Sequence, residues 1–368
     1  MPFAHITGWG MSVPESILTN DDLSKMVDTS DEWIRDRTGI RERRIVRDED
    51  QSTASLAVEA SIKALQVANL RPTDVDLIIC STSTPEHIFP ATACLVQDRI
   101  GATKAGAFDL LAACSGFIYA INMAAQSIRS GSIQNALIIG SETLSRFVNW
   151  QDRNTCILFG DGAGAFVLQA SEMPGGVLSA VMHSDGSGGE SLILQGGGSK
   201  YPASEATLQA GKHFIEMDGK EVFRFATRVM AQATREVLDD SGLELDELNW
   251  IIPHQANIRI IEAAARGLKM PLERFVINLD RYGNTSTASI PIATVEALED
   301  GRLKPGDKVV FVGFGAGLTW GALAAEWTGP LPSEKKVYPG RYRLWARMRS
   351  FLLRVIRFIE GVIWGRGS

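Results

Sequence analysis

The sequence predicts an α/β fold built from two similar halves. Apolar runs of strand length alternate with stretches in which apolar residues recur at helical spacing, a rhythm typical of α/β proteins with buried central strands. Segments of the first half also resemble segments of the second at one constant offset, which indicates a duplicated βα unit. The composition fits a globular protein of this class, because 45% of the 368 residues are hydrophobic and 22% are charged.

We expect the elements in the following order. Strands are predicted within residues 76–83, 106–113, 135–142, 163–170, 248–255 and 308–315, and helices over 55–68, from 114 onward and over 223–240. The repeat relates 69–83 to 242–256, and 135–140 to 308–313; chance similarity between ordinary α/β segments is the alternative. The predicted division is a first half at 1–172, a second half at 173–328, and a linker with a basic tail at 329–368.

A cysteine stands where one of the helices is expected to begin. Cys114 follows the apolar run Phe108–Leu111, and small residues surround it. The positive end of a helix dipole favours the thiolate, which predicts a nucleophile at this position. The alternative is a buried cysteine that only packs.

Two polar residues of the second half complete a candidate catalytic group. His254 comes directly after a predicted strand, and Asn284 lies in a glycine-containing turn before a predicted helix. Taken singly, the histidine is more typical of a hydrogen-bonded core residue and the asparagine of a turn. The repeat places Cys114 opposite Thr287, so the two junctions are expected to face one cleft.

The composition also excludes several classes of protein. The cysteines form no C-x-x-C pair and the histidines no metal-ligand cluster, so we expect no disulfide scaffold, no metal and a cytoplasmic location. The N-terminus lacks the pattern of a signal peptide, and no apolar stretch is long enough to span a membrane. The arginine-rich segment 37–47 is short and interleaved with acids, so nucleic acid is not an expected partner. The glycine-rich run 159–168 lacks the Lys-Ser/Thr of a nucleotide-binding loop and predicts a tight turn between strands.

Six stretches, in order along the chain, carry a family resemblance: VDTSDEWIRDRTGIRERR, ACSGF, FGDGAGAFVL, PHQANIRII, RYGNTSTASIP and GAGLTWGA. With them the chain resembles β-ketoacyl-acyl carrier protein synthase III, the condensing enzyme of the thiolase superfamily that initiates type II fatty-acid synthesis. The resemblance covers almost all of Ile6 to Trp327. It implies a thiolase-like fold with layers in the order α-β-α-β-α.

The resemblance also implies a role for each matching residue. Cys114 accepts the acyl group of an acyl-CoA, while His254 and Asn284 bind the malonyl thioester oxygen and stabilise the enolate formed on loss of CO2. The backbone N–H groups of Cys114 and Ala316 form the oxyanion hole. Coenzyme A enters as a substrate thioester, and no cofactor is expected.

Binding residues follow from the same resemblance. Those implied for coenzyme A are Thr29, Trp33, Arg37, Arg153, Phe223 and Asn257. Those implied for the acyl carrier protein are Gln255, Ala256, Asn257, Ile258 and Arg259. Phe89 is expected to cross the interface of a homodimer and to line the partner's acyl pocket.

Two rival functions remain open at this point. One is an acyltransferase of the same fold that acylates an alcohol or amine without condensation, which gains nothing obvious from Asn284. The other is a non-catalytic, membrane-associated partner subunit, which the joint presence of Cys114, His254 and Asn284 disfavours.

The C-terminal segment extends beyond the resemblance. Residues 334–368 hold nine Lys and Arg and two Glu, whereas residues 1–333 hold 28 and 41. On a helix one face is apolar and the other carries Arg343, Arg347, Arg354 and Arg357, with Trp345 and Trp364 near the ends. The apolar face comprises Leu344, Met348, Phe351, Leu352, Val355, Phe358, Ile359, Val362 and Ile363. This pattern predicts a peripheral contact with the anionic inner face of a membrane. The alternatives are packing on the acidic body or on the dimer mate.

Overall fold

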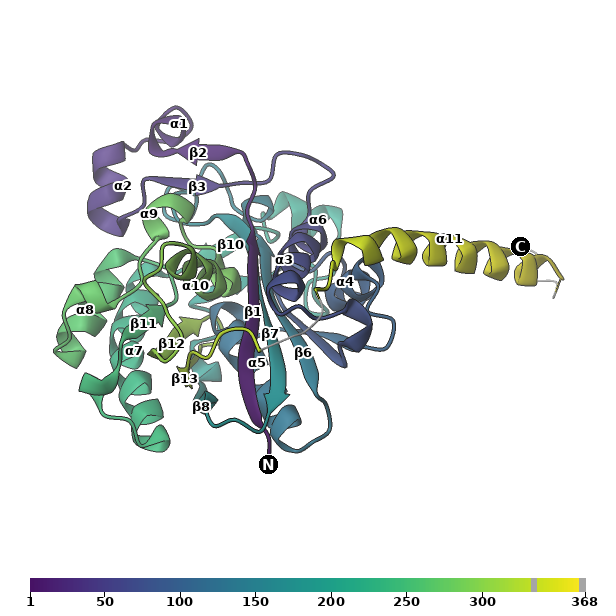
Figure 1. Cartoon of the computed structure of the whole chain (residues 1–368). Helices are drawn as coiled ribbons and strands as arrows, with labels where there is room; N and C mark the ends of the chain where they lie inside the picture. Colours follow the sequence, from purple (N-terminus) through teal and green to yellow (C-terminus); the bar gives the residue numbers. More distant parts are fainter. Residues whose placement is uncertain (332–335, 364–368) are drawn as a thin grey trace.

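Two mixed β-sheets form the centre of the computed structural model, which describes residues 1–331 and 336–363 (Figure 1). The first sheet runs β1 (Phe3–Ser12), β7 (Asp161–Ser171), β6 (Asn135–Thr143), β4 (Leu77–Ser81), β5 (Gly106–Leu110). The second sheet runs β11 (Trp250–Pro253), β12 (Lys308–Gly315), β13 (Thr319–Glu326), β8 (Gly176–Ser184). Pairing is parallel for β4 with β5 and β6 and for β11 with β12, and antiparallel elsewhere in the two sheets.

The second sheet repeats the strand order of the first at the predicted offset. The first residues of β1 and β8, of β4 and β11, and of β6 and β12 are all separated by the same length of chain. The four strands β1-β7-β6-β4 of the first sheet correspond in order to β8-β13-β12-β11 of the second, and β5 extends the first sheet by one further strand. The duplicated α/β fold expected from the sequence is therefore confirmed, while the boundaries at 172/173 and 328/329 stay a prediction.

Helices make the other three layers. The central layer consists of α5 (Gly116–Arg129) and α10 (Ser289–Glu299), whose apolar side chains share one core with both sheets. α3 (Thr53–Val67) and α4 (Thr92–Ile100) cover the outer face of the first sheet, and α7 (Gly219–Ser241) and α8 (Ile258–Leu268) that of the second. This order confirms the α-β-α-β-α layering. It also explains why most residues of α10 are buried, since helices and sheets surround it, whereas α5 buries only its apolar face.

Glycines in two strands let helices approach the first sheet closely. A Cβ at Gly8 of β1 would lie 2.2 Å from the Ala64 carbonyl oxygen of α3. A Cβ at Gly164 of β7 would lie 2.5 Å from Pro291 of α10. The tight turn predicted for residues 159–168 is therefore wrong: most of this run is strand, and its glycines serve helix packing rather than a turn.

The remaining elements surround this core. They are β2 (Ile17–Thr19), α1 (Asn20–Ser24), α2 (Asp31–Thr38), β3 (Glu42–Arg44), β9 (Leu192–Leu194), α6 (Glu205–Gln209), β10 (Ile215–Met217), α9 (Leu279–Tyr282) and α11 (Gly340–Ile363). α11 confirms the predicted C-terminal helix; Trp364, expected at its end, lies outside the described residues. Within 1–331 and 336–363, no helix is both long and apolar enough to cross a membrane.

Candidate active site

Two matching turns meet between the sheets. One 3-10 turn, Ala113–Ser115, leads into α5, and another, Ser286–Ala288, leads into α10. The repeat makes the two turns equivalent, and they are in contact. The first residue of each has a left-handed backbone, with φ of 45° at Ala113 and 49° at Ser286. The facing junctions predicted from the repeat are thus present.

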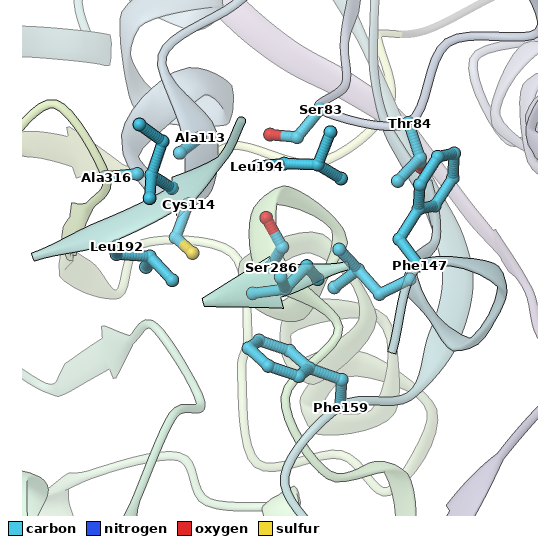
Figure 2. A pocket seen from close by; sticks show the side chains of 13 residues that line it. Ser83, Thr84, Ala113, Cys114, Phe147, Phe159, Leu192, Leu194, Ser286 and Ala316 are labelled. Carbon is cyan, nitrogen blue, oxygen red and sulfur yellow. The ribbon is translucent and has the colours of Figure 1, made fainter. Parts of the chain in front are cut away.

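Cys114 lies in the first turn and faces a narrow cavity. Its side chain is buried, and the cavity of about 100 Å³ is otherwise mostly apolar (Figure 2). The residues that line this cavity in the view include Ala113, Phe147, Phe159, Leu192, Leu194, Ser286 and Ala316. The cavity has the size and lining of a site for a short acyl chain attached to the sulfur.

Burial controls the protonation state of this cysteine. It raises the pKa of the Cys114 thiol to about 12, and a hydrogen bond with Ser286 offsets only part of that rise. The expectation of a thiolate, drawn from the helix N-terminus, therefore does not hold for the resting protein. The sulfur begins as a neutral thiol because desolvation outweighs the helix dipole.

His254 follows β11 and sits on a second cavity of about 80 Å³ that Cys114 also lines. Burial lowers its pKa to about 3, so the imidazole is neutral at physiological pH. Its Nδ1 lies 2.7 Å from Ser289 Oγ, and that oxygen also accepts the Gln255 N–H at 3.3 Å. A serine hydroxyl that already accepts one hydrogen bond can donate its own proton to Nδ1, which leaves the histidine proton on Nε2. Among the described residues Nε2 has no partner, so it is an open donor.

Asn284 lines the same second cavity from the opposite junction. Its backbone is held on both sides, by its own N–H to Leu158 O at 2.8 Å and by Gly160 N–H to its carbonyl at 3.0 Å. Its side-chain Oδ1 accepts the Ser286 N–H at 2.8 Å. Because a backbone N–H can only donate, this bond orients the amide and leaves Nδ2 to face a ligand.

Ala316 lies in the loop between β12 and β13 and lines the first cavity together with Cys114. The neighbouring Gly315 shows how near this loop comes to the cysteine. A Cβ there would lie 2.7 Å from the Cys114 backbone nitrogen. Only a glycine permits this approach, which brings the backbone of Cys114 close to the end of β12, where the 316–318 loop begins.

The residues expected to bind coenzyme A lie in two groups along the expected path. At its outer end the guanidinium groups of Arg37 and Arg153 lie 4.6 and 5.1 Å from the ring centre of Trp33. At its inner end Phe223 and Asn257 line the second cavity beside Cys114. The side-chain oxygen of Thr29, also on the expected path, is buried without a hydrogen-bond partner in the described part of the chain. The surface end therefore carries positive charge and an aromatic face, which suit an anionic nucleotide.

The expected carrier-protein contacts divide into two groups. Arg259 is exposed on α8, with its guanidinium 5.8 Å from the Phe223 ring centre, and Ala256, Asn257 and Ile258 are partly exposed beside it. Gln255 is different, because it is 1% exposed and its amide bonds only backbone groups, at Pro253, Val276 and Asn278. The prediction that Gln255 contacts a carrier protein is therefore wrong: it is a structural residue of the core.

Phe89 lies away from both cavities. It is 84% exposed in the segment between β4 and α4, and Ile88 beside it is 79% exposed. Leu111, directly after the edge strand β5, is 77% exposed. Together these residues leave an apolar surface along one edge of the first sheet.

Sequence reasoning missed three polar residues of the site. Ser286 and Ser289 hold Asn284 and His254, as described above. Glu142, at 0% exposure in β6, accepts hydrogen bonds from Thr84 Oγ1 at 2.6 Å and Ser286 Oγ at 3.0 Å, and burial raises its pKa to about 7. The repeat pairs Ala113 with Ser286 and could have pointed to that serine. Glu142 carried no such signal, because only the folded chain brings β6 to the second junction.

In the part of the chain that the structure describes, no group of His, Cys, Asp and Glu side chains could hold a metal ion.

Known proteins match this chain over most of its length. The family profile of 3-oxoacyl-[acyl-carrier-protein] synthase III matches residues 108–186, and the profile of the C-terminal part of that enzyme matches 238–327. The β-ketoacyl-[acyl-carrier-protein] synthase III of Symbiobacterium thermophilum is 54% identical over 88% of this chain and 97% of its own. The crystal structure of 3-oxoacyl-[acyl-carrier-protein] synthase III from Aquifex aeolicus is 46% identical, covers 88% of this chain and 100% of its own, and superposes with a TM-score of 0.81. The priming β-ketosynthase of the R1128 polyketide pathway is 34% identical over 89% of this chain and 97% of its own, with a TM-score of 0.82.

Proposed function

Because this chain belongs to the family of β-ketoacyl-acyl carrier protein synthases III, we propose how its own residues share that family's reaction. The enzyme is a condensing acyltransferase of fatty-acid synthesis. One observation carries the assignment of residues: a thiol from one junction, the Asn284 amide beside the matching junction and the His254 imidazole at the end of β11 line adjoining cavities.

In the first step Cys114 takes the acyl group from acyl-CoA. Its sulfur attacks the thioester carbonyl, the bond to the sulfur of coenzyme A breaks, and the cysteine proton leaves with coenzyme A as its thiol. The backbone N–H groups of Cys114 and Ala316 stabilise the oxyanion formed on the way. Exchange of one thioester for another keeps the acyl group activated for the next step.

In the second step malonyl-acyl carrier protein loses CO2 and the resulting carbanion attacks the acyl-cysteine. Cleavage of the carboxyl group leaves its electron pair on the α-carbon, delocalised onto the thioester oxygen as an enolate. His254 Nε2–H and Asn284 Nδ2–H donate to that oxygen, each worth about 3–4 kcal/mol in a dry site. As the new carbon–carbon bond forms, the Cys114 thiolate leaves and recovers a proton. No strong base is needed.

The proposed binding surfaces are those that the family implies. The adenine of coenzyme A lies between Trp33 and Arg153, and the rest of the molecule passes Thr29, Arg37, Phe223 and Asn257 to reach the thiol. Arg259 with its partly exposed neighbours Ala256, Asn257 and Ile258 contacts the carrier protein. An acidic carrier complements this cation at the mouth of the path.

The enzyme acts as a homodimer in this proposal. Edge strand β5 has no further strand beside it among the described residues and borders an apolar rim that includes Leu111, Ile88 and Phe89; such an edge is normally covered by another chain. A second copy placed on it would bring Phe89 toward the partner's acyl cavity.

The remaining proposals concern organisation and location. The chain consists of a first half at 1–172, a second half at 173–328, and an appended segment at 329–368 that includes α11. The enzyme works in the cytoplasm, and this segment gives it a peripheral contact with the inner face of a membrane. The supporting observation is the basic, amphipathic character of α11.

Intact-protein mass spectrometry with acetyl-CoA and malonyl-acyl carrier protein tests the catalytic proposal. We expect Cys114 to gain an acetyl group, and labelled CO2 and a 3-oxoacyl product to appear only when both substrates are present. Acetylation that passes to an alcohol or amine without CO2 would support the same-fold acyltransferase instead. A protein that gains no acetyl mass would contradict any catalytic role.

A further inference from the structure

α11 is fixed to the body of the enzyme along one narrow side. Arg343 pairs with Glu59 of α3 at 2.8 Å, and Ser350 Oγ donates to Asp98 of α4 at 2.6 Å. Between them Ala346 is 5% exposed and packs beside Gly101, where α4 ends. The contacts at 343, 346 and 350 recur at helical spacing, so a single stripe of α11 holds it to the first half.

The opposite side of α11 is apolar and uncovered. With about 100° of rotation per residue, its large apolar side chains span an arc of about 160° centred roughly opposite the attached stripe. Their exposed fractions are high, reaching 68% at Trp345 and 72% at Phe358. The arc comprises Leu344, Trp345, Met348, Phe351, Leu352, Val355, Ile356, Phe358, Ile359 and Val362. Figure 1 shows why no other described part of the chain covers it: α11 starts beside α4 and then extends away from the body.

The charges of α11 are arranged around this arc. Residues 340–363 contain six arginines and one acid, Glu360. Arg347 and Arg349 lie on the two edges of the arc and are exposed, while Glu360, also exposed, lies about 20° beyond Arg349, between that edge and the attached stripe. Within the described residues Arg343 is the arginine of α11 that has a carboxylate partner. The apolar face is thus bordered on both sides by arginines that form no ion pair in the described part of the chain, although both also line the groove between α11 and the body, together with Asp50, Glu59 and Asp98.

We propose that this apolar face of α11 lies in the interface of a bilayer of anionic lipids, with Arg347 and Arg349 at the level of the lipid phosphates. This deepens the peripheral membrane contact proposed above and rests on it. A helix lying in the interface plane buries such an arc while its basic edges meet anionic headgroups. The body of the enzyme cannot cover the arc, because it already holds the other side of the helix.

The charges of α11 favour lipid, rather than a second copy of this chain, as the partner of the apolar face. Pairing two α11 helices through their apolar arcs would bring the arginines at the edges of both arcs together, with a single glutamate per helix just beyond one of those edges. Anionic headgroups place the opposite charge at those edges instead. The body itself is acidic, with 28 Lys and Arg against 41 Asp and Glu in residues 1–333, so α11 is the part suited to approach an anionic surface.

Vesicle co-sedimentation tests this assignment, using the full chain, a version ending at Leu331, and two surface variants. The first variant combines Phe351→Gln with Phe358→Gln, which keeps helix-forming residues but removes apolar area. We expect it to bind phosphatidylglycerol–phosphatidylcholine vesicles about tenfold more weakly or worse. The second combines Arg347→Gln with Arg349→Gln, and each lost arginine is expected to weaken binding by about fivefold at low salt.

The vesicle experiment also includes a control variant and a comparison of low and high salt. Met173→Gln removes an apolar side chain that is 50% exposed far from α11 and is expected to bind like the full chain. Binding should fall between about 0.1 M and about 1 M salt, and it should be weaker on phosphatidylcholine alone. Condensation of soluble substrates should be the same in all forms, which separates this surface from the catalytic proposal.

Three results would overturn the assignment, each in its own way. Equal binding by the full chain and the version ending at Leu331 would remove both the peripheral contact and this surface. If the Phe351/Phe358 variant binds vesicles normally but the version ending at Leu331 does not, the peripheral membrane contact would stand, and the proposal that the apolar face makes it would be refuted. Weaker dimerisation of that variant in ultracentrifugation, with unchanged vesicle binding, would assign the face to a second copy.

Discussion

Replacing Asn284 should separate the two chemical steps. Asn284→Ala removes the Nδ2 donor from the enolate oxygen, and the loss of one preorganised donor costs about 3–4 kcal/mol of transition-state stabilisation, or roughly 10²–10³-fold in rate. Acyl transfer to Cys114 does not form this enolate, so loading from acetyl-CoA should remain. The reasoning rests on the position of the amide, since Oδ1 is occupied by the Ser286 N–H at 2.8 Å and Nδ2 is the group left for substrate.

Because Asn284 also accepts a hydrogen bond from the Ser286 N–H, Asn284→Ala has a second effect, on stability. It leaves a buried N–H without its partner, which costs about 1–3 kcal/mol of stability. Asn284→Asp is the matched control, because it retains an oxygen for the Ser286 N–H while it removes the donor and adds negative charge. Both variants should therefore lose condensation, and the aspartate should lose it at least as severely.

Two measurements on the same protein decide the matter. Labelled acetyl-CoA reports loading of Cys114, and labelled CO2 released from malonyl-acyl carrier protein reports the second step. Loss of acetyl loading in both variants, with thermal unfolding close to that of the parent protein, would refute the separation of roles. Condensation within about threefold of the parent rate in either variant would refute the donor role itself.

Three further predictions concern neighbouring groups. Ser289→Ala should slow condensation by about tenfold, the worth of one hydrogen bond, because His254 loses the partner that fixes its proton on Nε2; an unchanged kcat/KM for malonyl-acyl carrier protein would contradict this. Burial raises the pKa of Glu142 from 4.5 to about 7, so the free energy of unfolding should fall as pH rises through that interval. Glu142→Gln should remove up to about 3 kcal/mol of this change in the free energy of unfolding, measured by urea unfolding below and above that pH interval. The same pH dependence in the variant and the parent protein would contradict this. Arg259→Glu should raise the KM for malonyl-acyl carrier protein by about tenfold or more with little effect on acetyl-CoA loading, whereas Arg266→Glu on the same helix should affect neither.

The sequence predicted the features that depend on local pattern. Buried strands such as β6 and β12 are recognisable in the sequence as apolar runs. Because corresponding strands are separated by a constant length of chain, the sequence also predicted that the strand order of one sheet repeats in the other. The position of Cys114 at the start of a helix was also readable, because small residues and helical periodicity follow it directly. Local patterns succeed here because each strand and helix is defined by its own residues.

The errors came from contacts between distant segments. Gln255 sits in a stretch that resembles a surface contact, yet its amide is enclosed by the backbone of residues 276–278. Gly164 suggested a turn, but α10 packs against it from the other half of the chain. The pKa of Cys114 depends on the enclosing walls of its cavity, which come from both halves. None of these environments can be inferred from neighbours along the chain.

The left-handed residues Ala113 and Ser286 explain why the site lies at the seam of the two halves. A non-glycine residue with positive φ costs on the order of 1–3 kcal/mol and persists only where its surroundings enforce it. Here each strained turn is held against the other, between the two sheets and beneath the central helices. The strain turns the chain sharply just before α5 and α10, so Cys114 reaches the cavity from one half while the Ser286 N–H orients Asn284 from the other. Neither half has the complete set of groups, because the nucleophile belongs to the first and both donors belong to the second. Duplication thus supplied two copies of one junction. Divergence of their side chains gave one junction the cysteine that accepts the acyl group and gave the other the asparagine that binds the enolate.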